Sequence, residues 1–360
     1  MNNGPLNHTE CTILRGFAIL GIILHNYCHW LPAAVKENEF LFKLSNSESL
    51  MNTLLHPSDL LPIHLLSFFG HYGVPVFLFL SGYGLVKKYE APGAEDARPW
   101  PFIQFHYLKL FRIMIVGFIA FTLVDAITRG TFHYTFSGIL YQLLMVGNFH
   151  IHPERIIWPG PYWFFGLMLQ LYVIYRLLFF RRHWAYVVTA IAICGILQAC
   201  CEPESNLLNL LRYNCIGGML PFGTGILYAR FGKEHSKIHY STALILSAAA
   251  IFLFSLNYQL WLWTPLFITL LALSTVKMLP SFKWNWMAWV GQLSMPLFVC
   301  HPIARKIFIP LSKSGETYAG LCLYLLSSLG MAWIFMQIYN KIPQPRLLNK
   351  KRDKKEDYAR

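Results

Sequence analysis

The stretch at residues 14–30, LRGFAILGIILHNYCHW, is an apolar run in which one arginine, two histidines and an asparagine are embedded. A helix needs about 20 apolar residues to cross the hydrocarbon core of a bilayer, so this run is nearly long enough by itself. A polar or charged side chain facing lipid costs several kcal/mol, so these four side chains must face protein or a water-filled cavity. The stretch therefore predicts a membrane helix whose polar face serves either a functional site or polar helix packing. The four residues are Arg15, His25, Asn26 and His29.

The whole chain has the composition of a membrane protein. Of its 360 residues, 55% are hydrophobic and only 13% are charged, about half the charged fraction of soluble domains. Long, continuous apolar windows recur along the chain, which favours helices over the short alternating strands of a barrel. We expect an all-α polytopic membrane protein with about ten transmembrane helices. The expected spans are residues 11–32, 61–86, 103–128, 160–180, 184–201, 207–229, 240–257, 259–279, 286–309 and 317–340.

The positions of lysine and arginine predict the orientation. Basic clusters follow or close every second expected span and fall on one side of the membrane if the short apolar piece 137–147 does not cross. By the positive-inside rule that side is cytoplasmic. Both termini are then cytoplasmic, and 137–147 is re-entrant or interfacial. The main exceptions on the outer side are Arg305, Lys306 and Lys313. A functional arginine near an outer cavity would explain one of them.

Residues 1–345 are expected to form a single transmembrane domain, and 346–360 a basic cytoplasmic tail. The net charge is +13, and the tail carries a cluster of basic residues. Beside a membrane helix such a cluster is better suited to anionic lipid than to nucleic acid. The N-terminus lacks the features of a cleaved signal peptide, so the first span should be retained. None of the eight cysteines forms a CxxC pair, so we expect no disulfide framework and no metal site.

A second stretch, residues 73–85, reads GVPVFLFLSGYGL. Its Gly-Tyr-Gly resembles a potassium filter, but a filter needs a preceding pore helix and a threonine-valine lead-in. Here the triplet ends a long apolar run and leads into Lys87 and Lys88. A filter is therefore disfavoured, and small residues for close helix packing are the structural alternative.

Five segments in order resemble the acyltransferase-3 family of integral membrane acyltransferases. The similarity extends over residues 14–305, most of the chain, and five motifs in order are more specific than any one of them. The segments are RGFAILGIILH at 15–25, GVPVFLFLSGYGL at 73–85, YLKLFRI at 107–113, YWFFGLMLQLYVIYRLL at 162–178 and GQLSMPLFVCHPI at 291–303.

The resemblance implies a multi-pass enzyme of the bacterial inner (cytoplasmic) membrane. Such an enzyme moves an acyl group, with acetyl as the expected group, from cytoplasmic acyl-CoA to a hydroxyl of a cell-surface or lipid-linked glycan. Acyl-CoA is then a co-substrate, and no cofactor is permanently bound. The partners are acyl-CoA, a glycan or lipid-linked saccharide and membrane lipid, without nucleic acid. A glycan transporter or flippase without acyl transfer is the alternative, and a channel is a third.

The resemblance also implies catalytic residues. Arg15 and His25 match the first-helix pair of the family, although the family places its histidine eleven residues after the arginine and His25 is ten after. Asn26 occupies the eleventh place, so the general base is His25 or, less favoured, His29. An imidazole takes a hydroxyl proton near neutral pH. Asn26 or a backbone amide near Ser81 is a candidate oxyanion donor, and Ser81 as a covalent acyl carrier is less favoured.

The remaining site residues follow from the same resemblance and from the predicted sides of the membrane. Outer aromatic residues suit stacking on sugars but also suit an interfacial belt. Asp125 and Arg129, one turn apart, are expected to form a structural pair. The expected acyl-CoA site comprises Arg15, Lys109, Arg112, Ser81, Gly82 and Tyr83, and the expected acceptor site comprises His29, Trp158, Tyr162, Trp163, Gln170 and His301.

Overall fold

The computed structural model describes residues 5–94, 98–279 and 284–347, and within them every regular element is a helix. The predicted all-α fold class is therefore confirmed. The helices of the N-terminal half are α1 His8–Cys28, α2 Leu44–Leu55, α3 Leu61–Phe69, η1 Gly70–Tyr72, α4 Gly73–Tyr89, α5 Pro99–Ile127, α6 Phe136–Leu144, η2 Gly147–Phe149, α7 Pro153–Ile156, η3 Gly160–Tyr162, α8 Trp163–Ile174 and η4 Tyr175–Phe179. Those of the C-terminal half are α9 Trp184–Ala199, α10 Asn206–Tyr213, α11 Cys215–Phe231, α12 Lys237–Phe254, α13 Tyr258–Trp261, α14 Thr264–Met278, α15 Asn285–Gln292, α16 Ser294–Lys313 and α17 Thr317–Lys341.

Helical segments occur at all ten predicted spans, and in the described residues six of them are long and apolar enough to cross a membrane. The count of ten and the cytoplasmic termini stay predictions. The piece at 137–147 forms only the nine-residue α6, too short to span. Of the predicted basic tail, residues 348–360 lie outside the described residues. The six candidate spans are His8–Cys28, Leu61–Tyr89, Pro99–Ile127, Gly160–Phe179, Lys237–Phe254 and Thr317–Lys341.

α1 begins at a capping box and runs through the interior of the bundle. The Asn7 side chain accepts a hydrogen bond from the Glu10 amide, and the Glu10 carboxylate accepts one from the Asn7 amide, each at 2.8 Å. These two bonds satisfy amides that a helix start leaves without partners. α1 then packs against α3, α4, α15 and α16. The helix with the polar stretch is thus surrounded by protein, as the cost of polar groups in lipid requires.

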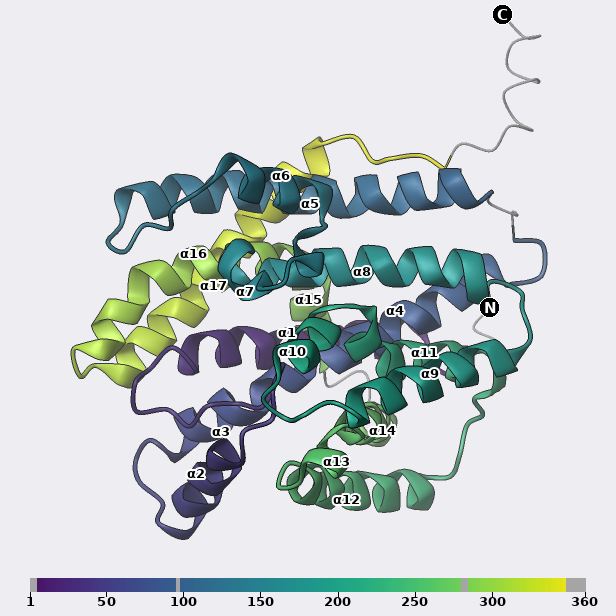
Figure 1. Ribbon diagram of the computed structural model, residues 1–360, viewed down its shortest axis with the longest axis horizontal. Coiled ribbons are helices and arrows are strands. Elements are labelled where there is room, and N and C mark those ends of the chain that lie inside the picture. The colour runs from purple at the N-terminus through teal and green to yellow at the C-terminus, as the bar shows by residue number, and fades with distance from the viewer. Residues whose placement is uncertain (1–4, 95–97, 280–283, 348–360) are drawn as a thin grey trace, which may run out of the picture.

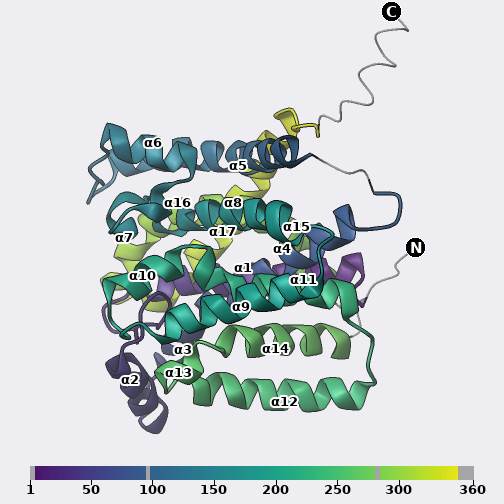
Figure 2. The same cartoon turned by 45° about the vertical axis from the view of Figure 1, so that its right-hand side comes forward.

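The long helices lie roughly parallel and stack in layers (Figures 1 and 2). In Figure 2, α5 and α6 form the top layer, α8 lies below them, α9 and α11 follow, and α14 and α12 form the lowest layers. Short elements gather at one end of the bundle, on the left of Figure 2; these are α2, α7, α10 and α13. We call this the α2 end. The connections that follow α4, α8 and α11 lie at the opposite end.

The basic clusters following α4, α8 and α11 meet at the opposite end, as the orientation argument requires. Arg230 donates to the carbonyl of Arg182 at 3.2 Å and forms an ion pair with Glu90 at 2.8 Å. Lys87 lies near them, in the same cavity as Arg230. One face of the molecule therefore carries the predicted cytoplasmic charges.

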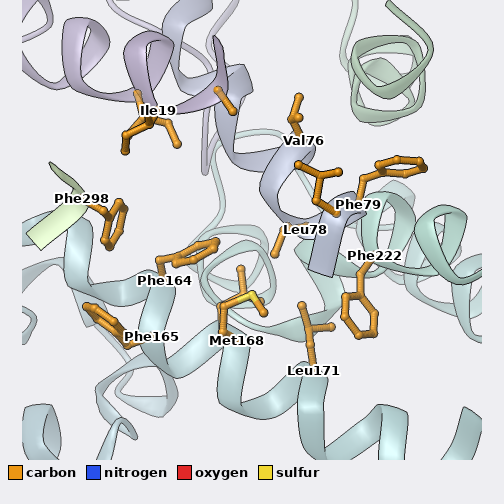
Figure 3. Close-up of a cluster of buried hydrophobic side chains, with 14 of the residues drawn as sticks. Ile19, Val76, Leu78, Phe79, Phe164, Phe165, Met168, Leu171, Phe222 and Phe298 are labelled. Atoms are coloured by element: carbon orange, nitrogen blue, oxygen red, sulfur yellow. The ribbon is translucent and has the colours of Figure 1, made fainter. Parts of the chain in front are cut away.

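A buried apolar core fills the middle of the bundle between its two ends (Figure 3). In lipid such a core is held together by close packing rather than by exclusion of water. α4 and α11 approach so closely that a Cβ on Gly82 would lie 2.2 Å from the carbonyl oxygen of Phe222. Residues labelled in Figure 3 include Ile19, Val76, Leu78, Phe79, Phe164, Phe165, Met168, Leu171, Phe222 and Phe298.

One expected ion pair is different in the structure. Asp125 is fully buried and pairs with Lys306 of α16 rather than with Arg129. Its carboxylate also accepts a hydrogen bond from the Phe132 amide at 2.9 Å. The expected pair with Arg129 is therefore wrong, because α16 brings a lysine from a distant part of the chain to the buried carboxylate. Lys306, one of the outer-side exceptions, thus has a structural role.

Candidate functional site

A cavity of about 410 Å³ opens at the α2 end of the bundle. It is built from the C-terminal end of α1, the loop that follows it, the start of α4, the segment before α8, and α16. We call it the His25 cavity. Its titratable or hydrogen-bonding side chains are His25, Asn26, His29, Trp30, Glu37, Glu39, His71, Glu154, Trp158, Trp163, Tyr213 and Arg305.

The ring of His25 is buried and held in one orientation. Its Nδ1 lies 2.7 Å from the carbonyl oxygen of Ser67 on α3, and a carbonyl can only accept. Nδ1 therefore carries the proton of the neutral ring, and Nε2 carries the free lone pair. Gly70 makes this approach possible, because a Cβ there would lie 2.6 Å from the Cβ of His25.

Glu37, in the loop after α1, faces both histidines. Its Oε1 lies 3.1 Å from Nδ1 of His29 and 3.9 Å from Nε2 of His25. Burial opposes ionisation of Glu37, but the hydrogen bond from His29 and the nearby imidazoles outweigh it and hold the pKa of that carboxyl below its usual range. Burial, with the charge of Glu37, raises the pKa of the neighbouring Glu39 to about 8. One carboxylate therefore stands ionised beside the two imidazoles near neutral pH.

Arg305 brings a positive charge to the other side of the cavity. Its guanidinium is buried, donates from Nη1 to the backbone carbonyl of Asn26 at 3.3 Å, and lies 4.8 Å from the ring centre of Trp30. Among the ion pairs of the described residues none involves Arg305. The Asn26 side chain donates to its own helix, at the carbonyl of Ile22. Arg305 therefore offers N–H donors to the cavity, whereas the side-chain amide of Asn26 already donates within α1.

Aromatic rings line the mouth of the His25 cavity. Trp30 and Trp158 meet edge to face with ring centres 6.3 Å apart. Phe40 stacks on Tyr213 at 3.9 Å and meets Trp163 edge to face at 5.1 Å. Such surfaces suit the flat, apolar faces of sugar rings as well as lipid chains.

Of the expected acceptor residues, His29, Trp158 and Trp163 line this cavity and the other three do not. The hydroxyl of Tyr162 donates to the Val299 carbonyl at 3.0 Å. Gln170 ties α8 to the start of α11 through Asn214 and Cys215. His301 is fully buried with Nδ1 3.1 Å from the Leu297 carbonyl. Tyr162 and Gln170 thus join helices in the structure, whereas His301 is bonded within α16.

A second cavity, of about 650 Å³, opens at the opposite end. Arg15, Tyr83, Lys87 and Arg230 line it, and we call it the Arg15 cavity. Lys109 does not line it, but its charge interacts with those of Lys88 and Arg15. The potential around Arg15 is therefore positive, which suits an anionic ligand.

Three further residues expected at the acyl-CoA site do not line the Arg15 cavity. Arg112 is buried, donates to the Tyr339 carbonyl and stacks on the Tyr339 ring at 3.8 Å. Gly82 is occupied by the packing of α4 on α11. Ser81 is half-buried and interacts with the hydroxyl of Tyr172, which also feels the charge of Arg15. Arg112 and Gly82 therefore serve helix packing, whereas Ser81 lies close to Arg15.

The two cavities have different linings. No described residue lines both of them, and Ile19, which belongs to the apolar core of Figure 3, stands between Arg15 and His25 in the sequence of α1. Arg15 and His25 are ten residues apart on α1, about 15 Å along its axis. The expected single polar stripe is thus divided, with Arg15 at one end of the bundle and His25, Asn26 and His29 at the other.

Three residues of the His25 cavity, Arg305, Glu37 and His71, are not among the site residues expected from the sequence. Only Arg305 gives a sequence signal, because it is a basic residue on the predicted outer side, where few are expected. Glu37 and His71 carried no local signal, because the loop after α1 and the turn before α4 bring them to His25 only in the folded chain. The rings of His71 and His25 lie 5.5 Å apart.

Comparison with known proteins identifies one match. Residues 10–337 match the model of a family described as an acyltransferase domain. No curated protein and no solved structure gives a significant match to the chain.

Proposed function

Because the chain belongs to the acyltransferase-3 family of membrane acyltransferases, we propose that it moves an acyl group from cytoplasmic acyl-CoA to a hydroxyl of a cell-surface or lipid-linked glycan. The expected group is acetyl, and His25 is the general base. The observation that carries this proposal is the fixed ring of His25, whose free Nε2 faces a cavity beside the Glu37 carboxylate.

The base chemistry follows from that geometry. The acceptor hydroxyl gives its proton to Nε2 of His25 as its oxygen attacks the thioester carbon, and imidazole is suited to this near neutral pH. The 3.9 Å between Nε2 and Glu37 is too long for a hydrogen bond. The carboxylate is still close enough to stabilise the imidazolium that forms. His29, the other candidate base, has its Nδ1 engaged by Glu37.

The thioester oxygen gains negative charge during attack and needs a donor. Arg305 supports this role because its guanidinium is buried in the same cavity, without a carboxylate partner among the described residues. A donor fixed before the reaction stabilises the transition state without reorganisation. The proton taken by His25 then returns to the thiolate of CoA, so that ester and thiol are the products.

The donor is proposed to bind at the Arg15 cavity. CoA carries several phosphate charges, and arginine suits phosphate through its planar fork. Arg15, Lys87 and Lys109 supply positive charge there. The narrow pantetheine arm would pass between the side chains of the apolar core to bring the thioester to His25. The acceptor would occupy the aromatic mouth beside Trp158 and Trp163.

One observation favours the alternative of a glycan transporter. Two cavities at opposite ends of the bundle, each lined by charged side chains, would also suit a carrier that admits its substrate from each side in turn. A transporter, however, moves glycan without consuming acyl-CoA.

The experiment compares surface glycans by mass spectrometry in cells that lack this protein and express either the wild type, His25→Ala or His64→Gln. His64 is a buried histidine of the α2 end that does not line the cavity. We expect an added acyl mass with the wild type and with His64→Gln and none with His25→Ala at equal membrane abundance. Normal acylation by His25→Ala would refute the catalytic role. Glycan export without any added mass would favour the transporter.

A further inference from the structure

We propose that His25, His29 and Glu37 form a reversible zinc site, and that zinc bound there stops acyl transfer. Metal binding stands on the geometry alone, whereas the inhibitory effect rests on the proposed function, in which His25 is the base. Each of the three side chains offers one ligand atom, and those atoms all lie within 4.8 Å of one another.

The separations are close to those of a zinc site. In a tetrahedral site with bonds of 2.0–2.1 Å, ligand atoms lie about 3.3 Å from one another. The Glu37 oxygen lies 3.1 Å from His29 Nδ1 and 3.9 Å from His25 Nε2, and the two imidazole nitrogens lie within 4.8 Å of one another, so the two rings would move together by at most about 1.5 Å to hold one ion. His29 would bind as the neutral tautomer with its proton on Nε2, and zinc would replace its hydrogen bond to Glu37.

The surroundings of the three ligands also fit a metal. Histidine ligands commonly donate their other ring N–H to a carbonyl, which fixes the ring, and His25 does so to Ser67. The second oxygen of Glu37 is buried without a hydrogen-bond partner in the described part of the chain. His71, which is buried and lines the same cavity, has no well-formed hydrogen bond at either ring nitrogen within that part. It stands beside His25, where a fourth ligand or a metal-bound water would lie.

The ligand spacing has a simple origin in the helix. His25 and His29 are four residues apart at the end of α1, so their side chains lie on one face. Two histidines at this spacing are a recurring metal-binding arrangement, with a third ligand supplied from elsewhere in the chain. The cysteines of this chain form no metal-binding pattern, and Glu37 reaches the two histidines only when the loop after α1 folds back.

Zinc and the acceptor hydroxyl would compete for one lone pair. The Nε2 atom of His25 cannot bind zinc and take a proton at the same time. His29 is partly exposed and the cavity is open at the α2 end, so an ion can enter from the solution on that side. Nitrogen ligands favour zinc over magnesium, which prefers oxygen.

The test uses the full chain, purified in detergent without a polyhistidine tag, stripped with EDTA and titrated with zinc chloride in a calorimeter. We expect one ion per chain, and affinities lowered at least about tenfold by His25→Ala, His29→Ala or Glu37→Gln. The matched control is His235→Ala/His239→Ala, which removes a pair with the same spacing at the opposite end. It should keep the wild-type affinity. Magnesium should not bind.

Two further measurements make every outcome decisive. Zinc should raise the unfolding temperature of the wild type and of the control pair but not of Glu37→Gln, and it should inhibit acyl transfer reversibly by EDTA. Absent binding, or equal binding by the three ligand variants, overturns the site and leaves the proposed function standing. Undiminished transfer by the zinc-bound protein overturns the inhibition. Zinc binding that needs all three residues in a protein that acylates nothing upholds the site and refutes the proposed function instead.

Discussion

Replacing Arg305 by methionine should abolish most acyl transfer while leaving the fold nearly intact. Arg305 is 5% exposed and lines the His25 cavity, and its polar and ring contacts within the described residues are to the Asn26 carbonyl at 3.3 Å and the Trp30 ring at 4.8 Å. If it donates to the thioester oxygen, methionine removes that donor while keeping much of the volume. Arg305→Lys keeps the charge but loses the planar fork.

The two effects are separated by measuring the rate per folded molecule. Removing one donor from a developing oxyanion lowers the turnover rate about 100- to 1,000-fold, or roughly 3–4 kcal/mol. The loss in stability is of similar gross size, because the contact with Trp30 contributes about 1 kcal/mol and a hydrogen bond to a charged group about 1.5–3 kcal/mol. Removing a buried, unpaired charge offsets part of this loss. Arg305→Lys should retain more activity than Arg305→Met.

The assay is the initial rate of labelled acetyl transfer from acetyl-CoA into membranes, divided by the amount of folded protein. The neighbouring Lys306→Met is the control. It leaves the buried Asp125 carboxylate uncompensated and should lower the free energy of unfolding by about 3–5 kcal/mol, with the rate per folded molecule unchanged. An Arg305→Met rate within about twofold of the wild type contradicts the oxyanion role, and so does a loss matched by Lys306→Met.

Further substitutions probe the two cavities separately. Gly70→Ala should displace the His25 ring, because the new Cβ would lie 2.6 Å from the Cβ of His25. The transfer rate should fall at least about tenfold, since a displacement of 1 Å costs up to about 100-fold. A wild-type rate would contradict the proposed fixed orientation of the ring. Arg15→Met should raise the KM for acetyl-CoA about tenfold with little change in kcat, as loss of uniform binding does; an unchanged KM in the same steady-state assay would remove the donor from the Arg15 cavity. Gly82→Ala should instead lower thermal stability by about 1–3 kcal/mol at unchanged KM, because its Cβ would meet the Phe222 carbonyl at 2.2 Å, and a raised KM would return it to the donor site.

The sequence predicted where the long helices occur, because each depends on a continuous apolar run, but the expected spans 207–229, 259–279 and 286–309 each contain two helices in the structure. The sequence also singles out Arg305, because it is a basic residue on the predicted outer side and so departs from the positive-inside rule that most of the chain follows. It could not foresee that Glu37 folds back onto His25, or that Arg112 binds α17 through Tyr339. Such contacts depend on which helices become neighbours, and spacing along one helix carries no information about that.

The same limit applies to the polar stripe of α1. Helical periodicity predicts that Arg15 and His25 lie near one face of α1. The position of each residue along the helix axis, however, decides which end of the bundle its side chain reaches. Figure 3 shows apolar side chains of α4, α8, α11 and α16 in one cluster with Ile19 of α1, which stands between Arg15 and His25 in the sequence. Two functional groups on one helix therefore belong to two cavities.

The separation of the two cavities has a consequence for how this protein can vary. No described residue lines both of them. A change of side chain at one end of the bundle can therefore alter which molecule binds there while the lining of the other cavity stays the same. The two selectivities can diverge independently among relatives.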